Sequence, residues 1–369
     1  MPEKKNRGAL IPRQREMTVR YRGRGSQVWI YFGKMLRMFV YQSDWKVIPM
    51  SALIAGLVGF VIRRRMFLNM EGTLMGSFAL VCVCIWNGCF NSIQVVCRER
   101  DVIKREHRSG MHISSYVTAH MLYQALICLV QTGVTLFITL KTGVRYPEQG
   151  LFTPWLIVDI GISMFLITYA SDMLSLWISS LARSSTTAMT IMPFVLIFQL
   201  VFSGGMLSLP DWSKPITWFT ISNPGLKVVA AQADVNNRPF VTISNMLVKM
   251  KDNKIELNTK AGKLLDLLER VDDPRVTDLL ELLKEVPGAQ EALEKEVKVE
   301  TTVGEVLQIA GEEEVRHYIE QNAAQASYNA DYENTKDNIT AYWMRLVMFV
   351  FLFALLAMIT LEFIDKDKR

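Results

Sequence analysis

Residues Val96–Tyr116 read VCRERDVIKREHRSGMHISSY, a dense cluster of charges between two long apolar segments. A charged side chain costs about 2.5–3.5 kcal/mol at the centre of a bilayer on insertion scales, so this cluster must lie outside the hydrocarbon. Glu99 and Glu106 are seven residues apart and therefore share one face of a helix. The stretch predicts a short charged helix that turns at Gly110 between two membrane spans.

Apolar segments long enough to cross a bilayer lie on both sides of this cluster and recur along the chain. A helix needs about 20 apolar residues to cross a hydrocarbon core of about 30 Å, and 50% of the 369 residues are hydrophobic. The pattern predicts an all-α polytopic membrane protein. Its six transmembrane helices are expected at Val47–Ile62, Leu74–Val96, Ile113–Leu140, Trp155–Leu181, Thr187–Leu209 and Tyr342–Ile364.

Charge is divided unequally among the segments outside these spans. Residues 1–46 carry eleven Lys/Arg and three Asp/Glu, which favours a cytosolic N-terminus and, with six spans, a cytosolic C-terminus. Arg98–His112 and the turn at Arg183 then lie on the inner side, as the positive-inside rule requires. The arginines at 63–65 break the rule, because they fall on the outer side.

Composition divides the chain into four parts. A basic tail (1–25), expected to be disordered, precedes a membrane domain (26–236), and an acidic insert (237–338) precedes the last span and a short tail (339–369). Because the basic tail leads into membrane helices, we expect it to contact anionic lipid, or simply to hold the N-terminus on the cytosolic side, rather than to bind nucleic acid. The membrane domain begins with an amphipathic helix over Ser26–Asp44, in which apolar residues recur at spacings of three and four: Trp29, Phe32, Leu36, Phe39 and Val40.

The last outer segment has two distinct patterns. Gly and Pro interrupt the aromatic, apolar stretch Val201–Asn236, which predicts a re-entrant outer hairpin shielded by protein. The insert that follows is acidic, and its leucines recur at helical spacing. It is predicted to be an extracytoplasmic domain of helices: 264–271, its echo 279–286, and a longer helix 301–325 capped by Thr301 or Thr302.

Two aspartates lie in the predicted fourth span. Asp172 is well inside it, and a carboxylate buried in a membrane is a functional candidate by default. It could face a polar path or pair with an arginine such as Arg98, and we favour structural pairing. Asp159 lies near the outer end of the span, where we expect water to reach it.

The sequence lacks the patterns of most catalytic and metal sites. Its four histidines do not cluster and its five cysteines lie in apolar segments, so we expect no metal site, disulfide framework or Ser/His/Asp arrangement. No Gly-x4-Gly-Lys-Ser/Thr motif occurs, so we expect no nucleotide cofactor in this chain. A membrane enzyme is accordingly the weakest functional hypothesis.

A set of motifs occurs in a characteristic order. It comprises Glu99-Arg100-x4-Arg105-Glu106-x3-Gly110 with Ser114-Ser115-Tyr116, Gln42–Lys46 before the first span, Phe202-Ser203-Gly204 after the fifth, and Trp218 with Ser222-Asn223-Pro224. Over residues 26–236 and 340–364 this set resembles the membrane domain of ABC exporters of the ABCG (white-pigment, multidrug) type. The chain departs from that family in having Gly110-Met111-His112 where the family has Gly-x-Tyr, and in its acidic insert.

The resemblance implies a permease subunit of an ABC exporter, without its ATPase domain, which moves a hydrophobic or amphipathic substrate outward. ATP and Mg²⁺ would be bound by a separate ATPase subunit. A second copy of the chain, or a homologous permease, would complete the pathway in the cell (plasma or inner) membrane, in contact with lipid. The ATPase would dock on a coupling helix whose residues include Arg98, Glu99, Arg100, Arg105, Glu106 and Gly110.

The resemblance also implies positions for a substrate cavity and an outer gate. Residues that line the central cavity in that family correspond to Trp86, Asn87, Phe90, Ile197 and Leu200, although plain helix packing would explain them equally well. The family closes its cavity with bulky residues where this chain has Gly205 and Met206, so we expect a gate that is weaker or built differently.

A second hypothesis is regulatory. On this interpretation the exporter-like scaffold transmits a signal, and the acidic insert senses cell-wall material or a peptide outside the cell. Flux through a reconstituted complex distinguishes the two hypotheses, because a sensor would show ligand-dependent ATP hydrolysis without transport.

Overall fold

The structure is a computed structural model that describes residues 23–42, 44–204, 214–238, 254–260, 296–302, 311 and 328–363. Several predictions fall outside these residues and stay predictions. They concern the basic tail before residue 23, the gate positions Gly205 and Met206, the helices at 264–271 and 279–286, and most of the helix at 301–325.

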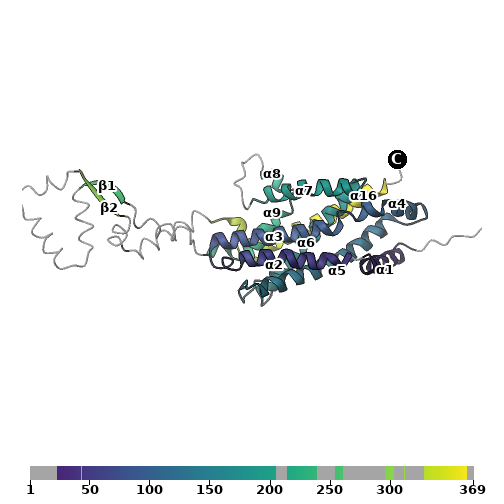
Figure 1. The fold of residues 1–369 in the computed structure, drawn as a ribbon, viewed down its shortest axis with the longest axis horizontal. Helices are drawn as coiled ribbons and strands as arrows, with labels where there is room; N and C mark the ends of the chain where they lie inside the picture. Colours follow the sequence, from purple (N-terminus) through teal and green to yellow (C-terminus); the bar gives the residue numbers. More distant parts are fainter. Residues whose placement is uncertain are drawn as a thin grey trace, which may run out of the picture.

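The helices lie side by side along one long axis (Figure 1). Several of them are joined by short turns, and Gly110 and Gly143 provide positive φ angles of 100° and 96° after α4 and α5. The elements are α1 (Arg24–Tyr41), η1 (Asp44–Lys46), α2 (Val47–Ile62), α3 (Met70–Ser92), α4 (Val95–Arg108), α5 (Ile113–Lys141), α6 (Leu156–Leu181), α7 (Ser185–Val201), α8 (Lys214–Thr217), α9 (Ser222–Gln232), η3 (Val235–Asn237), β1 (Lys254–Lys260), β2 (Glu296–Thr302), η4 (Ala330–Tyr332) and α16 (Lys336–Glu362).

The predicted membrane helices form, with one qualification. Five described helical segments are long and apolar enough to cross a membrane: Asp44–Ile62, Met70–Arg108, Ile113–Lys141, Leu156–Leu181 and Lys336–Glu362. The predicted fifth span corresponds to α7, an apolar helix of 17 residues that ends at Val201 rather than Leu209. At a rise of 1.5 Å per residue α7 extends roughly 25 Å, somewhat less than a typical hydrocarbon core.

The centre of the bundle is formed by α3, α6, α9 and α16. Helix α9 lies in the segment predicted to form a re-entrant hairpin, and ten of its eleven residues are buried. Helices α3 and α6 approach closely at Gly88, where an added Cβ would clash with the backbone of Thr168. Small residues at a helix crossing allow this close packing in a membrane, where lipid competes with apolar side chains.

Two described segments of the insert are strands, and they overlap a predicted helix only at Thr301 and Thr302. Strands β1 and β2 form an antiparallel pair in which Lys254 lies opposite Thr302 and Lys260 opposite Glu296. Thr301 and Thr302 therefore belong to a strand and cap no helix. The sequences KIELNTK and EVKVETT alternate polar with apolar or β-branched residues, a period of two that the reading of leucines at helical spacing overlooked.

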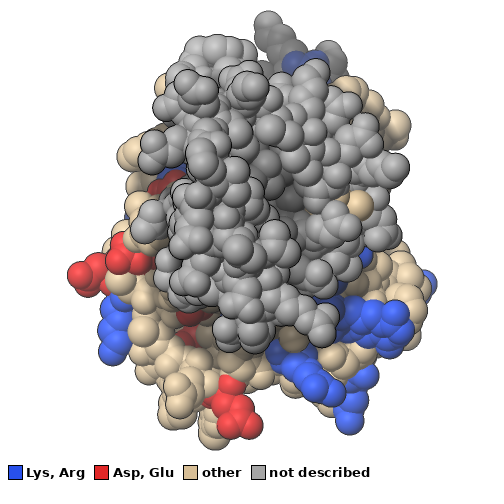
Figure 2. Space-filling model, turned by 90° about the vertical axis from the view of Figure 1, so that its left-hand side faces the viewer, with Lys and Arg blue, Asp and Glu red and all other residues tan. Residues whose placement is uncertain are grey.

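The two ends of the bundle differ in their helices and in their charged side chains. Helices α1 and α4 lie together at one end (Figure 1). Figure 2 views the other end, where Lys and Arg side chains gather along part of the rim. Arg64 and Arg65 are exposed in the loop after α2, and Arg238 donates to the Phe67 carbonyl oxygen at 3.1 Å, which ties this loop to the start of the insert.

Candidate functional site

Helix α4 is attached on one side to the C-terminal end of α6. The Arg100 guanidinium donates through Nη1 to the carbonyl oxygens of Ser180 and Ala182, each at 3.0 Å. The Ser179 hydroxyl accepts from the backbone N–H groups of Val96 and Cys97 at 3.2 and 3.3 Å. The last carbonyls of a helix have no partner within it and carry partial negative charge, so an arginine there both satisfies and stabilises them.

On its other side α4 contacts α1 and η1. Lys34 of α1 forms an ion pair with Glu106, in which Nζ lies 3.0 Å from Oε1. Arg98 lies 3.2 Å from an Asp44 carboxylate oxygen and donates to the Gln42 side-chain oxygen at 3.2 Å. Helix α4 is therefore held between the N-terminal amphipathic helix and the bundle proper.

The turn between α4 and α5 is bound by Gln27 of α1. Its Nε2 donates to the Gly110 carbonyl oxygen at 3.2 Å, and its Oε1 accepts from the His112 backbone N–H at 3.0 Å. Gln27 is 8% exposed, although it is not among the apolar residues that mark the face of this amphipathic helix. Sequence reasoning missed Gln27, because its only signal is a polar residue near the start of an amphipathic helix.

The six residues predicted to couple to an ATPase thus have different surroundings. Arg98, Arg100, Glu106 and Gly110 make the internal contacts described above. Arg105 is exposed on the outer surface of α4. Glu99 is half-buried on the side that faces α1.

Burial controls the ionisation of the side that faces α1. It raises the pKa of the Glu99 carboxyl, and the positive charges of Lys34 and Arg98 offset this only in part. Burial and the nearby Glu106 carboxylate raise the pKa of Tyr31 to about 12, so this phenol stays neutral at physiological pH. Both groups belong to the charged end of the bundle, beyond the apolar parts of the spans.

A charged helix that continues a membrane helix and turns at a glycine is the arrangement that the sequence motifs predict. Residues 13–227, more than half of the chain, match the family model of the ABC-2 type transporter. The chain belongs to the ABC-2 type transporter family. It is also similar to the ABC transporter ATP-binding/permease protein Rv1747 of Mycobacterium tuberculosis, with 28% identity over 156 residues that make up 41% of this chain. The match covers 18% of that relative's length.

The five predicted cavity residues of this ABC-2 type transporter do not gather at one place. Trp86, Phe90 and Ile197 are 40%, 46% and 58% exposed on the apolar faces of α3 and α7. Asn87 is buried and, together with Phe90, lines a pocket of about 200 Å³ between α2, α3 and α5, whereas Leu200 is half-buried. None of the five lines a larger apolar groove, of about 850 Å³, between α6, α7 and α16.

The two aspartates of α6 are both fully buried, with different partners. Asp172 pairs with no described cation. Neither carboxylate oxygen has a hydrogen bond of good geometry with a described residue, although the Ser92 hydroxyl lies close enough to interact with it. The suggested pairing with Arg98 is wrong, because Arg98 contacts Asp44. Asp159 is not hydrated as predicted, since the preceding loop folds over it. It accepts four hydrogen bonds, from the backbone N–H groups of residues 151, 152 and 153 and from the Thr153 hydroxyl.

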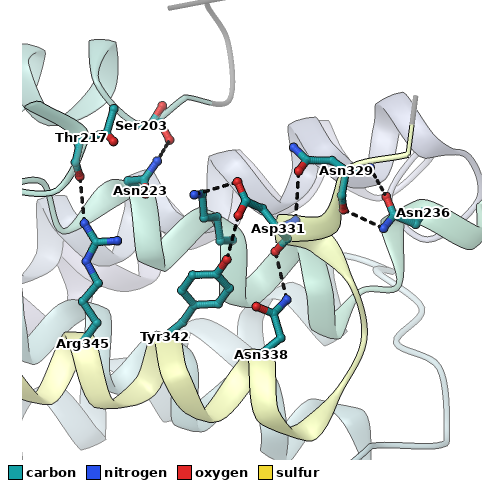
Figure 3. Close-up of polar contacts among 10 residues, drawn as sticks. Ser203, Thr217, Asn223, Asn236, Asn329, Asp331, Asn338, Tyr342 and Arg345 are labelled. Atoms are coloured by element: carbon teal, nitrogen blue, oxygen red, sulfur yellow. Dashed lines mark hydrogen bonds and ion pairs between the residues drawn. The ribbon is translucent and has the colours of Figure 1, made fainter. Parts of the chain in front are cut away.

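At the other end, the two ends of the insert are held together. Asn236 donates to the Asn329 carbonyl oxygen at 2.9 Å and accepts from its backbone N–H at 3.3 Å (Figure 3). Asp331 forms an ion pair of 2.8 Å with Lys227 of α9 and accepts from the Tyr342 hydroxyl of α16. The base of the insert is thereby joined to two helices of the bundle. No motif in the sequence marks these contacts.

Proposed function

We propose that this chain is the permease subunit of an ABC exporter that moves a hydrophobic or amphipathic substrate outward across the cell membrane. ATP hydrolysis in a separate ATPase subunit would drive transport, and α4 would transmit the movement. The name of the mycobacterial relative joins ATP-binding and permease functions, which supports such a pairing.

One observation carries the proposal: α4 is attached to both α1 and α6. Lys34 and Glu106 join it to α1, and Arg100 joins it to the end of α6. A partner that displaces α4 would move both neighbours with it, because each attachment uses hydrogen bonds to a charged group. Arg105 offers an exposed charge for docking. The helix α4 would then have two positions, one before and one after displacement by the partner. ATP binding to the ATPase subunit would select between them.

A second copy of the chain, or a homologous permease, would cover the apolar faces of α3 and α7. Trp86, Phe90 and Ile197 are large, exposed and apolar, and lie on neighbouring helices. Aromatic and aliphatic side chains of this kind suit either a subunit contact or the wall of a shared substrate pathway.

Reconstitution of the full chain with its ATPase subunit in proteoliposomes tests the proposal. We expect ATP-dependent movement of amphipathic dyes across the bilayer, together with ATP hydrolysis that depends on the permease. Hydrolysis without movement of any dye or fluorescent lipid in a broad panel would contradict export.

That outcome would favour the alternative function, a sensor that signals through the insert. The network at the base of the insert supports this alternative, because Lys227, Asp331 and Tyr342 connect the insert to α9 and α16. For a sensor we expect Asp331→Asn to change the response of ATP hydrolysis to an outside ligand, with the hydrolysis rate in its absence preserved.

We propose that both termini and α4 face the cytosol, and that the insert faces outward. Cysteines introduced one at a time, as Ser327→Cys in the insert and Ser109→Cys at the end of α4, test this orientation. In whole cells a membrane-impermeant thiol reagent should label the first and spare the second, against the background of the native cysteines. Labelling of Ser109→Cys alone would show that α4 faces outward and the insert faces the cytosol.

A further inference from the structure

A cavity of about 210 Å³ lies between α1, η1, α5 and the junction of α3 with α4. It adjoins the apolar faces of α3 and α7 assigned above to a subunit or substrate contact, since Phe90 and Met189 also line it. Tyr116, His120 and Gln124 form one wall, as a stripe along a single face of α5. Asp44, Arg98 and Glu99 line it from η1 and α4.

The α5 wall presents polar atoms that the protein leaves unpartnered. The Tyr116 hydroxyl, His120 Nδ1 and Gln124 Oε1 make no hydrogen bond with any described residue. All three side chains are at most 2% exposed. Buried polar groups in folded proteins are nearly always hydrogen-bonded, so three unpartnered atoms on one cavity wall indicate a bound molecule that supplies the partners.

The charged residues that line the cavity indicate which kind of molecule it would bind. Arg98 is paired with Asp44, and Lys34, the other cation near Glu99, is paired with Glu106. Lys34 and Arg98 act on the Glu99 carboxylate, but each forms its ion pair with another carboxylate, so the half-buried Glu99 has no ion pair of its own among the described residues. Burial raises the Glu99 pKa, and Lys34 and Arg98 offset this only in part, so a further cation beside the carboxylate would be stabilised.

The remaining walls suit an organic cation. The rings of Phe90, Tyr116 and Tyr123 line the cavity, and aromatic faces attract ammonium groups through their quadrupoles. Gln124 Oε1 adds an acceptor and no charge. The volume is smaller than the roughly 300–1,000 Å³ of sites for drug-sized ligands, so the ligand must be small.

We propose that this cavity binds a small organic ammonium ion, with Glu99 as its counter-ion. The ammonium group would lie between Glu99 and the acceptors of α5, and its apolar part would contact the aromatic rings. Because the cavity is lined by α1, α4 and α5, an occupant would hold α4 against α1. Binding at this site does not depend on transport, so it can be tested on the permease alone.

Calorimetric titration of the purified full-length chain in lipid nanodiscs tests the proposal. The probes are phenethylammonium, the neutral 2-phenylethanol and the anionic phenylacetate, with empty nanodiscs as a blank. We expect phenethylammonium to bind roughly tenfold or more tightly than the other two, because only it can pair with the carboxylate and the aromatic faces. Equal affinities for the three probes, or no binding of phenethylammonium above the blank, would overturn the proposal. This test needs only the wild-type chain.

Variants then locate the site. Glu99→Gln should remove the preference for the ammonium probe, and Met38→Trp, which fills the cavity from α1, should weaken binding without a change of charge. Asp101→Asn is the matched control, since it removes an exposed carboxylate of the same helix outside the cavity and should leave the affinity unchanged. Equal losses in Glu99→Gln and Asp101→Asn would mean that surface charge attracts the probe, and would overturn the site.

Discussion

Lys34 of α1 and Glu106 of α4 form an ion pair in which Nζ lies 3.0 Å from Oε1, although 72 residues separate them in the sequence. Their side chains are 33% and 30% exposed. Ion pairs this open to water contribute about 0.2–1 kcal/mol to stability, so the pair has little part in holding the fold together. Its effect is to fix the position of α4 against α1.

Removal of this pair should therefore alter coupling far more than stability. We expect Glu106→Ala to reduce the substrate moved per ATP by roughly fivefold or more, since allosteric couplings typically span this range, while ATP hydrolysis continues. The thermal midpoint should change little. Flux and hydrolysis measured together in proteoliposomes check this.

The control for this variant is Glu148→Ala, which removes an exposed carboxylate from the loop after α5. It should leave both flux and hydrolysis as they are. Unchanged transport per ATP in Glu106→Ala would remove the coupling assignment of Glu106.

Substitution of Arg100 should lower the stability of the protein, whereas substitution of Glu106 should not. Arg100→Ala leaves the Ser180 and Ala182 carbonyls at the end of α6 without their donor. Hydrogen bonds to a charged group contribute about 1.5–3 kcal/mol, so we expect a clear fall in the midpoint of thermal unfolding in detergent. Arg105→Ala removes an exposed arginine from the same helix and should change stability by less than about 0.5 kcal/mol. Similar losses in the two variants would show that the α6 contact is unimportant.

The membrane-spanning helices could be predicted from the sequence, but the hydrogen bonds that join them could not. The bounds of α2 agree with the predicted first span, and α6 begins one residue after its prediction, because apolar length alone marks a membrane helix. The bonds from Gln27 to Gly110 and from Arg100 to Ser180 join residues 83 and 80 positions apart, and no local pattern marks either. The strand pair β1–β2 had a local signal, an alternation with period two, which the leucine spacing outweighed.

The two buried aspartates of α6 should respond oppositely to the same substitution. Asp172 has no cation and no hydrogen bond of good geometry among the described residues, only the nearby Ser92 hydroxyl. A buried charge with so little compensation is very costly, so a neutral amide of the same shape should be accepted. We expect Asp172→Asn to leave the thermal midpoint nearly unchanged. Asp159 accepts four hydrogen bonds through both oxygens, and an amide group turns one acceptor into a donor. Asp159→Asn should therefore destabilise the chain by about 1–3 kcal/mol. A large loss in Asp172→Asn would indicate that its carboxylate is charged and bound to a cation.

Glu99 should give the stability of the permease a distinctive dependence on pH. Burial raises its pKa in the folded chain above the ordinary value of about 4.3, so the folded state holds this proton more tightly than the unfolded state. The stability that this group contributes is therefore fully present below pH about 4.3 and is lost as the pH rises through the folded pKa. Glu99→Gln cannot titrate. The midpoint of the variant minus that of the wild type should accordingly increase between about pH 4 and about pH 7. Glu148→Gln changes an exposed carboxylate in the loop after α5 and is the control for the substitution itself. A difference for Glu99→Gln that does not change with pH would mean that the Glu99 carboxylate finds a partner in solution. If an ammonium ion is that partner, phenethylammonium at pH 7 should reduce the difference between Glu99→Gln and the wild type.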